Sequence, residues 1–235
     1  MHQNKLVLLP NVISESDWRN AIPQNVRNEI IDIKTLVTED IRTARRYMRK
    51  LGYEGDFSEI EFFVLNKHTK ENEIVDFIQN NIQAEKIGML SESGLPCIAD
   101  PGNILVEIAR SFGFKIVPLT GPSSIFLALM ASGFNGQNFA FSGYLPIDKF
   151  ERKKRLTELE KMIIQHDQTQ IFIETPYRNQ QLFEAILQNC HSNIRLCIAT
   201  NITDTNEKIE VKELSEWKKT KIDISKQNTI FLLYK

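Results

Sequence analysis

Short apolar runs alternate with longer amphipathic segments along the first half of the chain. The apolar runs predict β-strands at residues 5–9, 35–39, 61–65, 86–90 and 114–119. The segments between them predict helices at residues 25–33, 41–52, 70–82 and 103–113, two of which end at Gly52 and Gly113. Strands that alternate with helices indicate a parallel sheet covered on both faces.

The pattern changes after residue 118. An aromatic segment at 133–146 leads into a charged helix at 148–165, and further strands are predicted at residues 169–174, 194–200, 208–212 and 229–234. The sequence therefore predicts two α/β domains joined by a short linker. Residues 1–118 would form an N-terminal domain with a parallel sheet, and residues 119–235 a C-terminal domain with a mixed sheet.

Composition narrows the class of protein. The 235 residues are 42% hydrophobic and 25% charged, and 29 basic residues nearly balance 30 acidic ones. This balance argues against nucleic-acid binding through the net charge of the whole protein, although binding through a local basic patch remains an alternative. We find no run of ~20 apolar residues and no signal peptide, so we expect a cytoplasmic protein without a membrane span. The three cysteines (Cys97, Cys190 and Cys197) and four histidines lack metal-site spacing, so we expect reduced thiols and no metal.

Three loops rich in glycine, proline and serine follow predicted strands. They are PNVISES (10–16), SESGLPCIADPG (91–102) and TGPSS (120–124). Ligands of open parallel sheets bind beyond the carboxyl ends of the strands, so we expect these loops to form a ligand site. Pro122 is expected in the first turn of a helix, where Ser123 and Ser124 could meet an electron-rich group. Tight turns without a ligand are the alternative, and the absence of GxGxxG and GxxxxGK[ST] argues against a dinucleotide site or a P-loop.

Several motifs together resemble a known family. TEDIRTARRYMRKLGY (38–53), LNKHTKEN (65–72), LSESGLPCIADPGNILVEIA (90–109), VPLTGPSSIFLALMASGF (117–134), FSGYLP (141–146) and IFIETPYR (171–178) occur in the order and spacing of the class III S-adenosylmethionine (SAM) methyltransferases, the tetrapyrrole methylase superfamily. Within it they most resemble the ribose 2′-O-methyltransferases of small-subunit ribosomal RNA. The resemblance covers residues 35–180 best. It implies an enzyme with two α/β domains, SAM between them, S-adenosylhomocysteine as a product, and a homodimer.

The resemblance also implies which residues hold the cofactor. The middle loop would wrap the amino-acid end and ribose of SAM, the serine loop would lie beside it, and segments of the C-terminal domain, including Asn201, would close around the adenine. The expected cofactor-binding residues are Pro10, Ser93, Gly94, Leu95, Pro96, Ile98, Asp100, Gly121, Ser123, Ser124, Ile125, Glu174, Thr175, Ile202 and Thr229.

The chain departs from the family pattern at several positions. Apolar Leu95 stands where a polar residue is usual, so only its backbone could bind, and the first loop has lost its glycine. The segment TNITD (200–204) lacks both charges of the family's basic pair, which looks substrate-related, and this loss favours a small-molecule substrate. We also expect no helical C-terminal extension of the kind that the ribosomal RNA enzymes carry. The motif TEDIR keeps Glu39, Asp40 and Arg42.

These three residues are the catalytic candidates, because methyl transfer to a hydroxyl needs an aligned acceptor and a base. Asp40 is the first candidate for the base, followed by Glu39 and Glu174. The alternative for Asp40 is a helix N-cap, which its place before IRTARRYM would equally explain.

Two basic clusters could hold RNA phosphates, and either could instead be a solvated helix face. The first comprises Arg42, Arg45, Arg46, Arg49 and Lys50, and the second Lys149, Arg152, Lys153, Lys154 and Arg155. Further candidates are Phe141, Tyr144 and Tyr177 for base stacking, with packing in the core as the alternative. His68 is a candidate site residue, with an ordinary exposed histidine as the alternative. Three hypotheses stay open: a methyltransferase of RNA or the ribosomal subunit, a methyltransferase of a small molecule such as a tetrapyrrole, and a non-catalytic SAM-binding protein.

Overall fold

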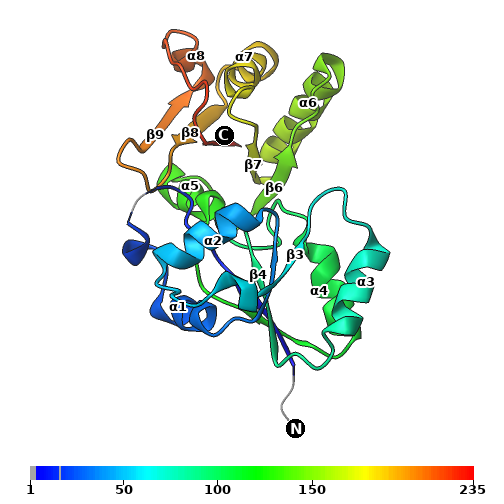
Figure 1. Ribbon diagram of the computed structural model, residues 1–235. Helices are drawn as coiled ribbons and strands as arrows, with labels where there is room; N and C mark the ends of the chain where they lie inside the picture. Colours follow the sequence, from blue (N-terminus) through cyan, green and yellow to red (C-terminus); the bar gives the residue numbers. More distant parts are fainter. Residues whose placement is uncertain (1–3, 16) are drawn as a thin grey trace. The chain divides into compact units, whose positions relative to one another are not determined.

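Two five-stranded sheets organise the chain in the computed structural model, one in each of the units Met1–Ser123 and Ser124–Lys235. The structure describes residues 4–15 and 17–235, so Ser16, the last residue of the predicted first loop, lies outside them. The units divide after the loop that follows the fifth strand, whereas the sequence predicts a boundary after residue 118, before that loop. Figure 1 labels helices and strands of both units along the chain.

The sheet of the N-terminal unit is wholly parallel, in the order β3-β2-β4-β1-β5. Its strands are β1 (Lys5–Leu9), β2 (Thr35–Thr38), β3 (Glu61–Val64), β4 (Lys86–Leu90) and β5 (Lys115–Pro118). The helices are α1 (Gln24–Ile31), α2 (Ile41–Lys50), α3 (Glu71–Asn80) and α4 (Gly102–Ser111), with short 3-10 turns η1 (Trp18–Asn20) and η2 (Phe57–Glu59). The predicted strands and helices of this half are confirmed, with ends that move by no more than two residues.

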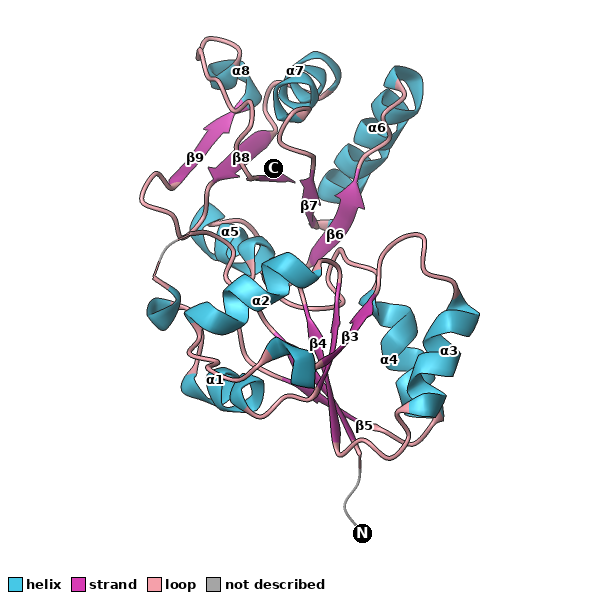
Figure 2. Cartoon of the chain, viewed as in Figure 1, coloured by secondary structure: helices cyan, strands magenta, loops and turns pink. Residues whose placement is uncertain are grey.

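Helices cover both faces of this sheet (Figure 2). Successive strand residues point to opposite faces, so β1 contributes Val7 and Leu9 to the core under α1 and α2, and Leu6 to the core under α3 and α4. The helix ends that carry Gly52 and Gly113 are also confirmed. At the end of α4, the Gly113 amide donates to the Arg110 carbonyl and the Phe114 amide to the Ala109 carbonyl, which closes the helix in a Schellman motif. Because helices cover both faces of the sheet, the loops at its carboxyl end are the part of this unit that can form a site.

The sheet of the C-terminal unit is mixed, in the order β6-β7-β10-β8-β9. β6 and β7 are parallel, whereas β10 is antiparallel to β7 and β8, and β9 is antiparallel to β8. The strands are β6 (Phe139–Tyr144), β7 (Thr169–Ile173), β8 (Arg195–Thr200), β9 (Lys208–Glu213) and β10 (Thr229–Tyr234). The helices are α5 (Ser124–Ser132), α6 (Lys149–His166), α7 (Asn179–Asn189) and α8 (Leu214–Trp217). One core joins the sheet to α6, α7 and α8, and α5 contacts β9 and β10.

Three local expectations differ from the structure. Strand β6 was not predicted, because its sequence FAFSGY contains Gly143 and its pairing with β7 is irregular between Phe141 and Tyr144. Helix α7 was not predicted either, since it opens on the polar residues NQQ. The expectation for Pro122 was wrong: α5 begins at Ser124, so Pro122 lies ahead of the helix and not in its first turn.

Candidate active site

The loops after β1, β4 and β5 pack against one another at the carboxyl end of the parallel sheet. Asn11 joins the first two: its amide N–H donates to the Gly94 carbonyl at 2.8 Å, and its side chain donates to the Ser91 and Glu92 carbonyls, both at 3.0 Å. Gly121 joins the third to the first, because a Cβ added there would lie 2.2 Å from the Pro10 Cβ. The predicted convergence of these loops is therefore observed within this unit.

Asn11 was missed as a site residue by the sequence analysis. Its side chain is only 4% exposed and its Oδ1 atom accepts from the Val12 amide. The Tyr47 hydroxyl holds the same segment from α2 by donating to the Pro10 carbonyl at 2.9 Å. An asparagine directly after a buried strand was the one available signal, since buried amide side chains are normally kept for hydrogen bonding.

The second loop has an unusual backbone. Gly94, Cys97 and Ala99 have φ angles of +70°, +66° and +62°, a region that costs non-glycine residues about 1–3 kcal/mol each. Asp100 fixes this shape, because its Oδ1 atom accepts from the Cys97 amide at 2.8 Å and the Gly102 amide at 2.9 Å. Its Oδ2 atom is enclosed and meets no hydrogen-bond donor among the described residues. The loop thus holds one buried acceptor ready for a further donor.

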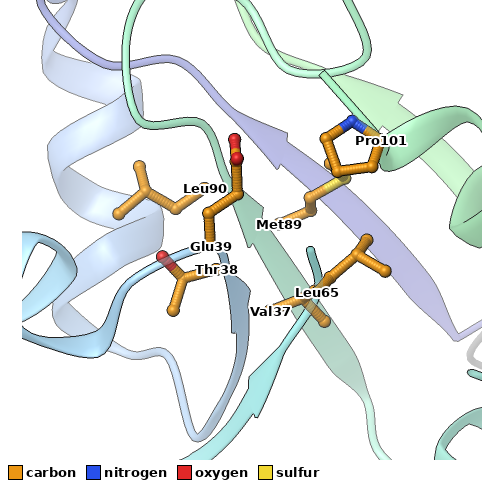
Figure 3. A pocket seen from close by; sticks show the side chains of 7 residues that line it. All are labelled: Val37, Thr38, Glu39, Leu65, Met89, Leu90 and Pro101. Carbon is orange, nitrogen blue, oxygen red and sulfur yellow. The ribbon is translucent and has the colours of Figure 1, made fainter. Parts of the chain in front are cut away.

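A small pocket lies beside this loop, at the ends of β2, β3 and β4 (Figure 3). In Figure 3, Glu39 and Pro101 lie on two sides of it, with Met89 between them. Burial, and then the charges of Asp100 and Glu92, raise the pKa of the Glu39 carboxyl above its ordinary value. The residues that line the pocket are Val37, Thr38, Glu39, Leu65, Met89, Leu90 and Pro101.

Asp40 occupies a different environment from Glu39. It is the N-cap of α2, and its carboxylate accepts from the Thr43 amide at 2.7 Å. This hydrogen bond holds the pKa of Asp40 below its ordinary value, and the side chain is exposed. The capping alternative for Asp40 is therefore confirmed, and a further role as a base stays a prediction. The neighbouring candidate Arg42 is exposed on the first turn of α2.

The basic cluster on α2 divides into two groups. The Arg45 guanidinium lies 5.3 Å from the Phe57 ring and 5.1 Å from the Phe62 ring, and that of Arg49 lies 4.4 Å from the Phe57 ring. Arg42 and Arg46 are exposed and form no salt bridge with the residues that the structure describes. Burial, and then the charge of Asp40, raise the pKa of the Glu92 carboxyl, and the nearby charge of Arg46 offsets only part of this rise. Arg45 and Arg49 are exposed as well but lie over aromatic rings, and a role of any of these arginines in holding phosphate stays a prediction.

The adenine segments predicted in the C-terminal unit come together at one edge of its sheet. Thr229, which opens β10, pairs with Thr200 of β8, and Ile230 pairs with Ile173 of β7, so Glu174, Thr175, Asn201 and Ile202 follow adjacent strand ends. Glu174 is buried, and its Oε1 atom accepts from the Thr175 amide at 2.6 Å and from Arg178 Nη2 at 2.6 Å. Thr229 accepts from the Asn179 side chain at 3.0 Å.

The other candidates vary in accessibility. Pro10, Pro96 and Ile125 are buried, Leu95, Ser123 and Ser124 are half-buried, and Ser93 and Ile98 are exposed. Phe141 is half-buried, whereas Tyr144 and Tyr177 are exposed, so the core interpretation is wrong for these two tyrosines. His68 lies on an exposed turn after β3.

Comparison with known proteins identifies the family. The family model described as Tetrapyrrole (Corrin/Porphyrin) Methylases matches residues 27–218. The chain belongs to this family. As a tetrapyrrole methylase family member it is 28% identical over 195 residues to the ribosomal RNA small subunit methyltransferase I of Vibrio cholerae serotype O1, covering 83% of this chain and 65% of that protein. Its identity to the Haemophilus influenzae protein of the same name is 29% over 199 residues, covering 83% and 67%. The chain thus spans about two thirds of the length of these relatives.

Solved structures show that this family member has the fold of tetrapyrrole methylases. The methyltransferase CobJ superposes with a TM-score of 0.64 at 15% identity and covers 98% of this chain and 94% of its own. Cobalt precorrin-4 methyltransferase CbiF gives 0.62 at 14% identity, covering 99% and 95%. Uroporphyrin-III C-methyltransferase from Thermus thermophilus, in complex with S-adenosylhomocysteine, gives 0.60 at 12% identity, covering 99% and 98%. The expected fold class is therefore confirmed.

The described residues also bear on membrane association. No helix within residues 4–15 and 17–235 is both long enough and apolar enough to cross a membrane.

Proposed function

We propose that the chain is a SAM-dependent methyltransferase that acts on ribosomal RNA of the small subunit, at a ribose 2′-hydroxyl. Its sequence relatives carry the name ribosomal RNA small subunit methyltransferase I, which supports RNA as the substrate. The proteins named for corrin and porphyrin chemistry are similar only in fold, at 12–15% identity, so the small-molecule alternative has less support. The observation that carries the proposal is the set of interlocked loops beside the Glu39 pocket.

The donors and acceptors of these loops suit the amino-acid end of SAM. The buried Asp100 Oδ2 atom lacks a donor among the described residues, and an ammonium group would satisfy it. The rest of the amino-acid end and the ribose of SAM would be held by the backbone of Gly94, Leu95, Pro96 and Ile98, together with Ser93, Pro10, Gly121 and Ser123. The family resemblance assigns further contacts with the same cofactor to Ser124, Ile125, Glu174, Thr175, Ile202 and Thr229. The non-catalytic alternative is less attractive, because the first loop keeps its position through Asn11 despite its lost glycine.

We infer that Glu39 is the general base, ahead of Asp40. When bound, SAM supplies an activated methyl group on a sulfonium, so the chain has to orient the acceptor and take its proton. Glu39 lines the pocket, and its raised pKa makes it a stronger base than an ordinary carboxylate. Asp40 is a weaker base, since the Thr43 amide stabilises its ionised form. Arg42 would help to position an RNA phosphate.

Two further features belong to this proposal. A homodimer is expected from the resemblance, and sedimentation of the purified protein tests it. A cytoplasmic location is expected because ribosomal RNA is the proposed substrate and the three cysteines are unpaired.

Calorimetric titration with SAM tests the cofactor proposal. Wild-type protein should bind SAM, and Asp100→Asn should bind it more weakly, because the amide has only one acceptor oxygen and no negative charge to attract an ammonium group. Asp32→Asn serves as the control, since Asp32 is an exposed carboxylate just after α1, before β2 begins. Absence of binding at millimolar SAM would contradict the proposal.

A further inference from the structure

Arg152 is a buried cation without a partner in the protein. It lies on the first turns of α6, and its side chain is only 4% exposed. No acceptor, carboxylate or aromatic ring within the described part of the chain bonds to, pairs with or stacks on its guanidinium. None of its nitrogen atoms is fully enclosed, so the small exposed remainder includes the guanidinium. A guanidinium keeps its charge at all relevant pH values, and buried charges in proteins are normally paired.

Arg155, one turn further along α6, has hydrogen-bonding partners and provides a comparison with Arg152. Its guanidinium lies 3.2 Å from Glu158 Oε2 and donates to the Ser142 hydroxyl at 3.2 Å. Three exposed lysines, Lys149, Lys153 and Lys154, surround Arg152 in sequence and form no salt bridge in the described structure. Two acids, Asp148 and Glu151, lie in the same turn, but Asp148 caps α6 and neither carboxylate forms a salt bridge with these cations in the described structure. The positive charge around Arg152 is therefore only partly offset by the protein.

Exposed aromatic rings lie at the same end of the sheet. β6 and β7 are parallel, with Tyr144 paired with Ile173, and α6 begins five residues after Tyr144. Tyr144, Phe150 and Tyr177 are 55%, 73% and 81% exposed. Aromatic side chains next to unpaired cations are the features with which proteins bind single-stranded nucleic acid, by base stacking and phosphate contacts.

We propose that Arg152 binds a backbone phosphate of the RNA substrate, while Phe150 and Tyr177 stack on neighbouring bases. The proposal rests on the proposed function for its ligand class. Phosphate fits the fork of an arginine, whereas Lys149 and Lys153 would act as point charges around it. This assigns the β6–β7 end of the C-terminal unit as a substrate-binding edge.

The test compares Arg152→Met with Arg155→Met. RNA affinity is measured by fluorescence anisotropy of a labelled single-stranded oligouridylate over a range of salt concentrations. Arg152→Met should weaken binding by about ten- to a hundredfold and reduce the salt slope by about 0.7, the loss of one phosphate contact. Arg155→Met should change affinity by less than about threefold, because this guanidinium is already partnered and half-exposed. Arg152→Lys should restore part of the affinity.

Melting temperature separates a binding role from a structural one. A methionine replaces the buried stem of the arginine and removes the buried charge, so Arg152→Met should melt at the same temperature as the wild type or higher. A lower melting temperature with unchanged RNA affinity would overturn the proposal, as would equal losses in the two variants or no RNA binding by the wild type. Loss of a dimer in Phe150→Ala or Tyr177→Ala would show that the rings form a subunit interface instead. SAM titration of Arg152→Met should match the wild type, so failure of the cofactor proposal is seen separately.

Discussion

Glu39 and Asp40 are adjacent carboxylates whose surroundings shift their pKa values in opposite directions. Burial and the nearby charges of Asp100 and Glu92 raise the pKa of Glu39, whereas the Thr43 amide lowers that of Asp40. Such divergence between neighbouring groups is typical of acid–base sites. The sequence could name both residues but could not rank them, because the ranking depends on which one caps the helix.

Glu39→Gln should remove most of the methyl transfer while leaving the protein at least as stable. Loss of a general base lowers the rate by about 10²- to 10⁴-fold. The raised pKa means that the folded state binds a proton at Glu39 more tightly than the unfolded state, so the ionised form at neutral pH opposes folding. A neutral glutamine should therefore raise the melting temperature slightly, as measured by calorimetry.

The wild-type rate should also depend on pH. Glu39 must be ionised to accept a proton, so the rate should fall as pH drops through its raised pKa, and Glu39→Gln should lose this dependence. Asp40→Asn is the matched control, because asparagine is an equally good N-cap. If Asp40→Asn abolishes transfer and Glu39→Gln does not, the assignment of the base is wrong.

Asn11→Ala should weaken SAM binding through the shape of the second loop. The change leaves the Ser91 and Glu92 carbonyls without their side-chain donor, at a cost of about 1–3 kcal/mol for the buried Ser91 carbonyl. We expect a lower melting temperature and a larger loss of SAM affinity than in Asn66→Ala, which removes a similar turn contact after β3. Equal SAM affinity in wild type and Asn11→Ala would contradict a role of this loop in binding. Gly94→Val is a poorer test, since a φ of +70° strains any side chain there.

The arginines of helix α2 have two different kinds of surroundings. All four arginines are exposed, but Arg45 and Arg49 lie over the rings of Phe57 and neighbouring aromatic residues, whereas Arg42 and Arg46 make no such contact in the described structure. The run of arginines was visible in the sequence. Its division was not, because the aromatic partners come from the segment after the helix.

Changing Arg42 and Arg46 together to Gln should flatten the salt dependence of RNA binding by about 1.4, or about 0.7 for each phosphate. Changing Arg45 and Arg49 to Gln should instead lower the melting temperature and leave the slope unchanged, since cation–π contacts stabilise the fold. SAM affinity should be unaffected in the first pair. Equal slopes in both double variants would show that the exposed face of α2 is only solvated.

The other helices and strands also differ in how far the sequence predicts them. Strands and helices of the N-terminal unit were predictable because their apolar residues recur with a clear period. β6 and α7 were not, since Gly143 and an irregular pairing interrupt the first and a polar start conceals the second. Pro122 was misplaced because a proline suits both the first turn of a helix and the residue before its cap.

At the scale of the whole molecule, alternating strands and helices predicted two α/β units, and the motifs predicted the family. Both the fold class and the family are confirmed. The substrate is harder to predict from the sequence, because no sequence motif distinguishes Arg152, the proposed phosphate-binding residue, from the other basic residues around it. Its significance depends on burial without a partner, which only the packing of α6 reveals.

Transfer of labelled methyl from SAM to RNA tests the central claim most directly. Purified protein would be incubated with labelled SAM and either isolated small ribosomal subunits or extracted RNA, and the nucleosides would be separated after digestion. We expect label in a ribose-methylated nucleoside, in wild type and Asp40→Asn but not in Glu39→Gln. Label in a tetrapyrrole and not in RNA, or no transfer to any acceptor by a protein that binds SAM, would contradict the account.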